Sequence, residues 1–398
     1  MRKVEAVMGA TFGNAKNPLL FSVRSGARAS MPGMMDTVLN IGLNETTVAG
    51  LIAKTGDERF VYDSYRRLIE MYADVVMGLD IKEFHALLDA KKKQKGVWHD
   101  VDLDAADLKA LAGDYKKKVR EISGRDFPDD PTDQLWGAVR AVFESWNVPR
   151  AVSYRRLYDI PDDWGTAVNV QAMVFGNMGE GCATGVAFTR DPGTGERVFY
   201  GEYLPNAQGE DVVSGVRTPH PINKAQKKRG DAPALEETMP DIYRELEAIR
   251  ERLERHYTDT QDIEFTIQRG KLWMLQTRTG KRTAQAAVRI AVEMEQEGLI
   301  DRKTAVLRVD PEQVEQLLHK RLDPAAKYTA LTKGLPASPG AAVGRVVFTA
   351  EDAVRWAEAD AQAADDDKEN HRTILVREET SPEDIDGINA SQIGRAHV

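Results

Sequence analysis

The stretch DIEFTIQRGKLWMLQTR, residues 262–278, predicts a β-hairpin around which the fold can be built. Polar and apolar residues alternate along 262–267, and in a strand successive side chains point to opposite faces. Gln268, Arg269 and Gly270 predict a three-residue loop in which the glycine takes the left-handed conformation. We therefore expect an antiparallel pair of strands with one apolar face and one polar face.

The polar face of this hairpin carries oxygen-bearing side chains. Asp262 and Glu264 share it, and a three-residue loop would place Asp262 opposite Gln276. Mg²⁺ binds through one or two carboxylates and completes its shell with phosphates and water, so these residues form a candidate metal site. A solvated strand face explains the same spacing, and the pattern alone leaves both interpretations open.

Two arginines near the N-terminus form a second candidate site. In FSVRSGARASMPGMMDT, residues 21–37, Arg24 and Arg28 are expected in a Ser/Gly loop that follows an apolar strand over 17–24. Guanidinium groups present fixed forks of donors to phosphate oxygens, and glycines let the backbone approach an anion closely. An ordinary surface turn with two charges is the alternative.

Two other segments have the composition of ligand-contacting loops. Residues 175–196 contain six glycines and could present backbone N–H groups to phosphates, but they match neither GxGxxG nor GxxxxGK[ST], and β-hairpin turns explain them as well. Residues 200–219 place Glu202 near a turn after a strand, where it could meet a base or a ribose. A polar loop accounts for that segment equally.

Composition excludes several classes of protein. The formal net charge of −9 argues against a nucleic-acid-binding protein, and no run approaches the roughly 20 apolar residues of a membrane span. The single cysteine, Cys182, rules out an internal disulfide and favours a reducing compartment. Residues 1–13 lack the apolar core of a secretory signal, so we expect a cytoplasmic protein.

The length of 398 residues exceeds one core of about 100–200 residues and predicts several domains. The C-terminal segment predicts a strand over 373–376 and the start of a helix near 381–385, and the sequence ends soon afterwards. We therefore expect the chain to be an internal part of a longer protein. Residues 393–398, IGRAHV, are what the adapter-like codons ATC GGA AGA GCA CAC GTC encode. We hypothesise that these residues are not native, which genomic sequence will test.

Four blocks read together resemble the nucleotide-binding region of the pyruvate, phosphate dikinase family. They are residues 22–40, 185–196, 201–219 and 261–283, which follow the family's order within a resemblance that covers most of 17–390. The resemblance implies an α+β fold: an ATP-grasp nucleotide-binding domain with a helical insertion, then the beginning of a β-rich, swivelling phosphohistidine domain. In an ATP-grasp domain two lobes hold ATP and Mg²⁺ between them.

The resemblance also implies domain boundaries. The expected parts are a portion of the first ATP-grasp lobe (1–48), the helical insertion (49–125), the lobes that complete the nucleotide cleft (126–290), a helical linker (291–334), an incomplete swivelling domain (335–392) and the non-native tail (393–398).

Site roles carry over by motif position. The resemblance implies that Arg24 binds the ATP phosphates and acts in catalysis, and that Asp262 and Glu264 contact nucleotide and metal. Gln276 completes that metal-binding patch. Arg28 and Glu202 are further expected nucleotide contacts.

The implied reaction converts ATP, phosphate and pyruvate to AMP, pyrophosphate and phosphoenolpyruvate through a phosphohistidine. The family's ATP-contacting lysine segment is not seen before residue 17, and its phosphohistidine segment would follow residue 392. We therefore expect this chain not to complete the reaction. Pyruvate or phosphoenolpyruvate binding and homodimerisation are expected only of the full-length family enzyme.

Two alternatives stay open at this point. One is a related enzyme of the phosphoenolpyruvate synthase type, and the other is a nucleotide-binding module without turnover. The segment MPGMMDTVLNIGLN, residues 31–44, and the helical insertion favour the dikinase.

Overall fold

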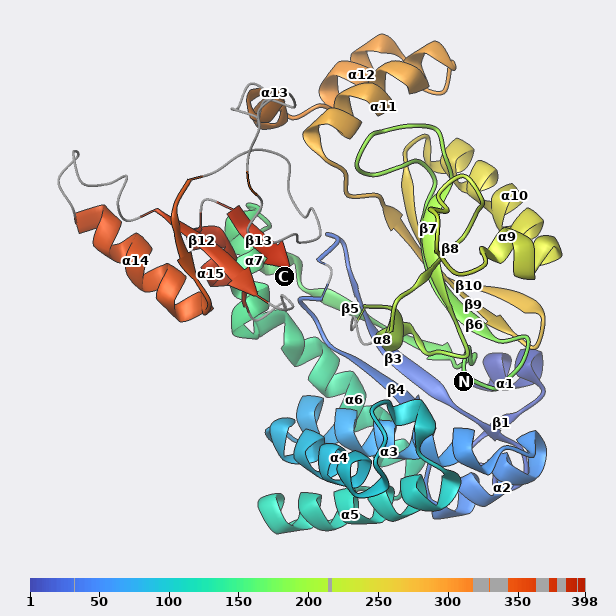
Figure 1. Ribbon diagram of the computed structural model, residues 1–398. Coiled ribbons are helices and arrows are strands. Elements are labelled where there is room, and N and C mark those ends of the chain that lie inside the picture. Colours follow the sequence, from blue (N-terminus) through green and yellow to red (C-terminus); the bar gives the residue numbers. More distant parts are fainter. Residues whose placement is uncertain are drawn as a thin grey trace. The chain divides into compact units, whose positions relative to one another are not determined.

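The computed structural model in Figure 1 describes residues 1–31, 33–213, 217–317, 329, 343–362, 372–377, 384–391 and 393–397. The chain divides into two compact units, Met1–Val174 and Phe175–Val398. Helices and sheets occur in both units, which confirms the expected α+β fold. The finer division into lobes, insertion, linker and swivelling domain stays a prediction.

Strand β3 (Phe21–Ala27) is the centre of a sheet in the first unit. It pairs antiparallel with β4 (Thr37–Ile41) on one side and with β5 (Thr166–Ala172) on the other. A short parallel pair, β1 (Thr11–Phe12) and β2 (Pro18–Leu19), and helix α1 (Arg2–Met8) precede it. The first apolar residues of β3 are buried, so the strand forms part of the core of this unit.

Helices fill most of the remaining first unit, including the range 49–125, where a helical segment was expected. Side chains of Asn44, Asp57, Asp104 and Asp130 accept hydrogen bonds from backbone N–H groups of the first turns and so define four helix starts. The helices are α2 (Glu45–Thr55), α3 (Glu58–Val75), α4 (Lys82–Lys95), α5 (Ala105–Ser123), α6 (Pro131–Glu144) and α7 (Pro149–Leu157).

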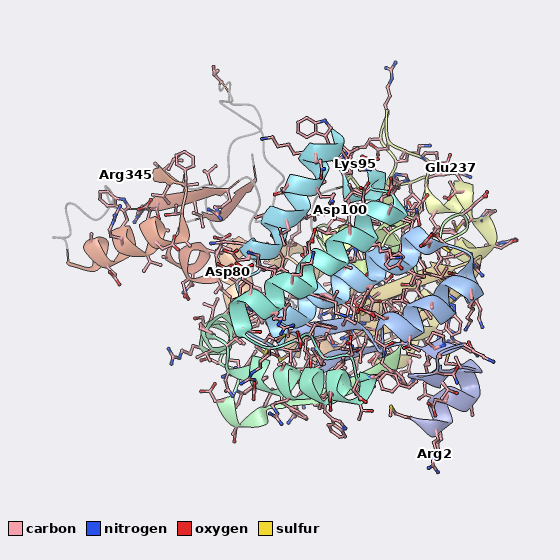
Figure 2. All side chains as sticks on the ribbon, turned by 90° about the horizontal axis from the view of Figure 1, so that it is seen from below. Arg2, Asp80, Lys95, Asp100, Glu237 and Arg345 are labelled. Atoms are coloured by element: carbon pink, nitrogen blue, oxygen red, sulfur yellow. The ribbon has the colours of Figure 1, made fainter. Side chains whose placement is uncertain are left out.

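A buried arginine connects α3 to the segment between α4 and α5. Arg66 in α3 lies 2.9 Å from Asp63, 3.2 Å from Glu70 and 2.7 Å from Asp100, which is labelled in Figure 2. Burial alone would raise the pKa of Asp63, but the positive charges of Arg67, Arg66 and Arg59 outweigh it and lower the pKa to about 2. The network therefore depends on an ionised Asp63.

The second unit contains an antiparallel sheet with the order β10-β9-β6-β7-β8 among the described residues. Its strands are β6 (Ala183–Phe188), β7 (Tyr200–Pro205), β8 (His220–Pro221), β9 (Gln261–Gln268) and β10 (Lys271–Thr279). Ile263, Phe265 and Ile267 on β9 join Leu246 of α10 in one buried cluster. Helices α9 (Leu235–Thr238) and α10 (Pro240–Tyr257) thus cover the apolar face of this sheet, as Figure 1 shows.

The 262–278 hairpin forms, but its predicted register was wrong. Arg269 and Gly270 both have positive φ, 51° and 74°, and close the hairpin with two residues, so Lys271 pairs with Gln268. An irregularity between Met274 and Gln276 adds one further residue to β10. As a result Gln276 lies opposite Glu264, and the residue opposite Asp262 is Arg278.

Helices and a small parallel sheet follow the hairpin. They include helix α11 (Ala284–Gln296) and helix α13 (Pro311–Leu317), after which residues 318–328 lie outside the described part. The sheet has the order β11-β12-β13. The remaining elements are α8 (Gly209–Val213), α12 (Arg302–Leu307), β11 (Arg345–Val347), α14 (Ala350–Gln362), β12 (Thr373–Arg377), α15 (Ile385–Ala390) and β13 (Ile393–His397).

Strand β12 confirms the strand expected at 373–376. The helix start expected at 381–385 falls partly on residues 381–383, which the structure does not describe, and α15 begins at Ile385. The β-rich start expected from 335 is described only from residue 343. In the described ranges, no helix is both long enough and apolar enough to cross a membrane.

Candidate functional site

One lateral row of the second unit's sheet carries three of the expected site residues. Glu202 on β7 pairs with Val186 on β6, Val186 pairs with Glu264 on β9, and Glu264 pairs with Gln276 on β10. Residues in register on adjacent strands point to the same face. Glu202, Glu264 and Gln276 therefore share the face opposite the apolar cluster. Glu202 lies inside a strand, so its expected position near a turn was wrong.

Asp262 lies on the same face, two residues before Glu264 on β9. Its neighbours in the next lateral row are Phe188 on β6 and Arg278 on β10. The fold thus brings Asp262, Glu264 and Gln276 together, although not in the pairing that a three-residue loop predicted. Arg24 and Arg28 belong to the first unit.

Arg278 is a further member of this polar cluster, and no motif in the sequence predicted it. Its Nη2 lies 2.7 Å from Oε1 of Glu264 and 3.2 Å from Oδ2 of Asp262, so one guanidinium bridges both carboxylates. The two-residue period of β10 could have predicted it, because Arg278 follows Gln276 by two residues and shares its face. Only the observed register, however, places Arg278 directly opposite Asp262.

The two acidic positions differ from ordinary surface carboxylates. Burial raises the pKa of Asp262; Arg278 lowers it, Glu264 raises it, and the net change is upward. Burial also raises the pKa of Glu202. The sheet therefore disfavours the charged form of both groups.

The donor set fits a shared magnesium site better than a closed protein cage. Within the described residues, no group of three or more His, Cys, Asp and Glu side chains could hold a metal ion. Asp262, Glu264 and the amide oxygen of Gln276 supply two carboxylates and one neutral oxygen on one face. Mg²⁺ uses such partial sets when nucleotide phosphates and water provide its remaining ligands.

The two arginines of the first unit have different settings. Arg24 lies inside β3, paired with Thr37 on β4 and Asn169 on β5, so the expected loop position of Arg24 was wrong. The strand continues through Gly26 to Ala27 because β5 pairs with it as far as Ala27, although β4 pairs with it only as far as Arg24. Arg28 follows the end of the strand, as predicted, and its guanidinium carbon lies 4.6 Å from the ring centroid of Trp164.

The glycine-rich segment 175–196 is explained by packing and turns. A Cβ on Gly185 would lie 2.4 Å from the ring of Phe265, and one on Gly176 would lie 2.4 Å from a backbone oxygen. Cys182 is buried, and its Sγ accepts a hydrogen bond from the backbone N–H of Arg269 at 3.2 Å. These contacts give Gly176, Gly185 and Cys182 packing roles in this segment.

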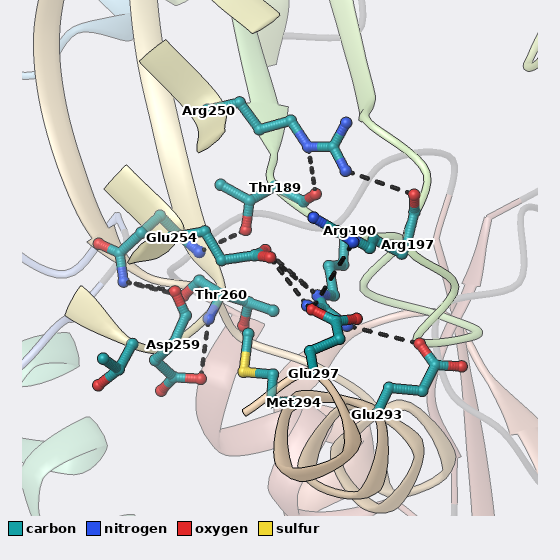
Figure 3. A network of polar contacts seen from close by, with 12 residues as sticks. Thr189, Arg190, Arg197, Arg250, Glu254, Asp259, Thr260, Glu293, Met294 and Glu297 are labelled. Atoms are coloured by element: carbon teal, nitrogen blue, oxygen red, sulfur yellow. Dashed lines mark hydrogen bonds and ion pairs between the residues drawn. The ribbon is translucent and has the colours of Figure 1, made fainter. Parts of the chain in front are cut away.

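Two residues after the end of β6, a fully buried arginine contacts side chains of two helices. Figure 3 shows Glu254 of α10 and Glu293 of α11 reaching Arg190, together with Glu297 just after α11. The Nη2 atom of Arg190 is 2.8 Å from Glu254 and 2.7 Å from Glu297, and its Nη1 is 3.5 Å from Glu293. One cation therefore connects three acidic side chains.

This buried network lies beside the start of the acidic strand. Thr189, the neighbour of Arg190, donates from its backbone to the carbonyl of Gln261 at 2.9 Å. The backbone N–H of Gln261 in turn donates to Oγ1 of Thr189 at 3.0 Å. These bonds fix the backbone one residue before Asp262, so the Arg190 network supports the position of β9.

Comparison with known proteins identifies the family. Residues 1–242 and 225–299 match the model described as pyruvate phosphate dikinase, AMP/ATP-binding domain. Over 392 residues the chain is 55% identical to pyruvate, phosphate dikinase of Rhizobium meliloti (strain 1021) and to that of Clostridium symbiosum, with 98% of this chain and 42% and 43% of those relatives covered. Over 393 residues it is 52% identical to pyruvate, phosphate dikinase 2 of Zea mays, with 98% and 42% covered.

The chain thus spans less than half the length of these curated relatives. The matched family model covers most of the chain, and the polar sheet face described above lies within it. The chain belongs to the pyruvate phosphate dikinase family, and its residues 1–299 correspond to the AMP/ATP-binding domain of that family.

Proposed function

We propose that this chain binds Mg-ATP and forms the ATP-binding, phosphoryl-transfer region of a pyruvate, phosphate dikinase. The observation that carries the proposal is the shared sheet face on which Asp262, Glu264 and Gln276 lie together, inside the segment that matches the family's nucleotide-binding model. In the longer protein, ATP, phosphate and pyruvate would yield AMP, pyrophosphate and phosphoenolpyruvate through a phosphohistidine.

The cluster around Asp262 is the proposed place for the cation that accompanies ATP. Asp262, Glu264 and Gln276 would hold Mg²⁺, which neutralises charge on the transferring phosphoryl group when bound. Glu202, in the same row two strands from Glu264, would contact the nucleotide. Arg278 balances the two carboxylates in the absence of a cation and can turn to phosphate oxygens when one binds.

Arg24 and Arg28 are the proposed phosphate contacts of the first unit. Phosphoryl transfer leaves little covalent work to the protein, so positioning and positive charge near the transferred group supply most of the catalysis. We assign the catalytic role to Arg24 and a nucleotide-binding role to Arg28. Both assignments rest on motif position and on the ability of guanidinium groups to bind phosphate.

The remaining partners belong to the proposal for the longer protein. Inorganic phosphate, pyruvate and a second subunit would act there, and we expect none of these reactions to be completed by this chain alone. A reducing compartment such as the cytoplasm suits the single, buried Cys182. Some relatives are named as chloroplastic enzymes, which is a second compartment for proteins of this family.

Titration calorimetry of the chain with Mg-ATP tests the binding proposal. We expect saturable binding that Glu264→Gln weakens at least tenfold, because a metal or phosphate contact is lost. Glu251→Gln is a matched control, since Glu251 is an exposed residue of α10, which packs on the opposite face of the sheet. Absence of binding, or equal binding by both variants, would contradict the proposal.

The same family fold could serve a phosphoenolpyruvate synthase-type enzyme. Pyrophosphate formation that requires inorganic phosphate separates the dikinase from that alternative, and it is measured in the full-length protein. A protein that binds Mg-ATP and never becomes phosphorylated would instead be a binding module without turnover.

A further inference from the structure

We propose that Trp164 is a positioning residue that holds the Arg28 guanidinium ready to bind a phosphoryl oxyanion. The guanidinium carbon of Arg28 lies 4.6 Å from the centroid of the Trp164 ring, within the range of a cation–π contact. The inference deepens the proposed function, on which it rests, by adding a residue that no motif assigned.

Strand pairing brings the two side chains together. Ala27, the last residue of β3, pairs antiparallel with Thr166, the first residue of β5. Arg28 follows Ala27 and Trp164 precedes Thr166 by two residues, so both lie at the same end of this strand pair. The contact therefore follows from the register of the first unit's sheet.

The turn that carries Trp164 is fixed independently of Arg28. Trp164 ends the short helix η3 (Asp162–Trp164). Indole Nε1 of Trp146 donates to the Asp162 carbonyl at 3.0 Å, and Nε of Arg155 donates to the Asp162 carboxylate at 2.7 Å. Trp164 can thus restrict the flexible Arg28 side chain by stacking against its guanidinium group.

Arg28 differs from two other stacked arginines in how its donors are used. The guanidinium carbon of Arg155 lies 4.3 Å from the Trp146 ring centroid, and Arg155 also donates a hydrogen bond to Asp162. The guanidinium carbon of Arg250 lies 5.5 Å from the Phe199 ring centroid, and Arg250 also donates a hydrogen bond to the Thr189 carbonyl at 2.9 Å. Within the part of the chain that the structure describes, Arg28 forms no hydrogen bond or ion pair. The face of the Arg28 guanidinium therefore contacts the Trp164 ring, while its N–H groups stay available to a ligand.

A guanidinium in this state suits a phosphoryl group. Stacking uses the face of the guanidinium, and phosphate oxygens bind to the donors in its plane, so both contacts can exist together. Ordering Arg28 before the ligand arrives reduces the conformational entropy that binding must overcome. The half-exposed indole, with 43% of its surface accessible, also allows a ligand to approach from solvent.

Binding of inorganic tripolyphosphate, inorganic phosphate and Mg-ATP to the whole chain tests this inference by calorimetry. We expect Trp164→Ala to weaken tripolyphosphate binding about three- to tenfold, Trp164→Phe to retain most of it, and Arg28→Ala to weaken it at least as much as Trp164→Ala. Trp98→Ala is the control, because Trp98 is the most exposed tryptophan, at 88%. The phosphate arm shows whether one phosphoryl group suffices.

Fluorescence provides a readout that a purely structural role would not move. The emission of Trp164, taken as the wild-type spectrum minus that of Trp164→Phe, should change when tripolyphosphate saturates the chain. An unchanged difference spectrum, or equal affinity of wild type and Trp164→Ala, would overturn the inference even if Trp164→Ala were unstable, because Trp164→Phe keeps an aromatic ring.

The outcomes separate this inference from the proposed function. Wild type that binds tripolyphosphate through Arg28 and Trp164 but does not bind Mg-ATP would refute only the proposed function. Wild type and all Arg28 and Trp164 variants that bind Mg-ATP equally well would refute only the present inference. Absence of binding of all three ligands would refute both.

Discussion

The Nη2 atom of Arg278 lies 2.7 Å from Oε1 of Glu264, and the same atom lies 3.2 Å from Asp262. This bridge places a positive charge between two carboxylates that share one sheet face. The positive charge of Arg278 reduces the electrostatic repulsion between the two partly buried carboxylates. It also makes the protonation of Asp262 depend on Arg278.

Replacing Arg278 should shift the pH dependence of Mg-ATP binding. Burial already raises the pKa of Asp262 and Arg278 opposes that rise, so Arg278→Gln should raise the pKa further. A higher pKa leaves more of the carboxyl protonated at acidic pH, and the affinity of the variant should fall at a higher pH than that of wild type. Calorimetry between pH 5 and 8 measures this shift. Coincident pH profiles for the two proteins would contradict the prediction.

Loss of a proposed phosphate or metal contact should reduce phosphoryl transfer. In the full-length protein, Arg24→Ala or Glu264→Ala should lower autophosphorylation by more than tenfold, the scale of a lost charge contact in a transition state. Transfer of labelled phosphate from ATP measures the effect, with Glu251→Gln as the control. Activity within a factor of two of wild type would count against the assignment.

Breaking the Arg190 network should destabilise the second unit. Arg190→Met leaves the buried Glu254 without its partner, and removing one member of a buried ion pair costs about 3–5 kcal/mol. Arg197→Met is a suitable control, because Arg197 is 55% exposed and its contact with Glu297 is 3.8 Å long.

Denaturant unfolding of both variants measures this difference. The double variant Arg190→Met/Glu254→Met should recover much of the loss, because it removes both buried charges. A single Arg190→Met variant as stable as wild type would show that the network does not hold the segment after β6 to α10 and α11.

The helical part of the first unit should lose stability in acid through Asp63. Burial raises the pKa of Asp63, but Arg67, Arg66 and Arg59 outweigh burial and lower it from 3.8 to about 2. Between those values the unfolded chain binds more protons than the folded chain, so this stabilising contribution is present above pH 3.8 and is lost as the pH falls through about 2. The shift in the pKa of Asp63 contributes about 2 kcal/mol to the free energy of unfolding above that range.

Urea unfolding monitored by helical circular dichroism at pH 5 and at pH 2 tests the role of Asp63. Asp63→Asn should be less stable than wild type at pH 5 and should show a smaller difference between the two pH values. An equal pH dependence in wild type and Asp63→Asn would place the acid sensitivity elsewhere.

Alternation in the sequence was sufficient to identify the hairpin and its two faces. It placed Ile263 and Phe265 in the core and Asp262 and Glu264 on the polar face, because a strand's side-chain period of two is a local property of the chain. The sequence also predicted a helical segment over 49–125, where helices α2 to α5 form. These features depend on neighbours within a few residues.

Register and partners required the tertiary structure. Gln276 lies opposite Glu264 because of the conformation of Arg269 and the irregularity near Met274. The alternation of polar and apolar residues predicts neither feature. Glu202 joined the same row only because β6 pairs with both β7 and β9, across large separations in sequence.

The sequence by itself therefore determined which side chains carry the proposed chemistry and which face of their strand they occupy. The tertiary structure decided their neighbours: Arg278 between the carboxylates, Arg190 buried among three glutamates, and Trp164 beneath Arg28. The physical reason is that a strand's faces follow from local backbone geometry, whereas pairing between strands is chosen by burial and hydrogen bonding over the whole fold.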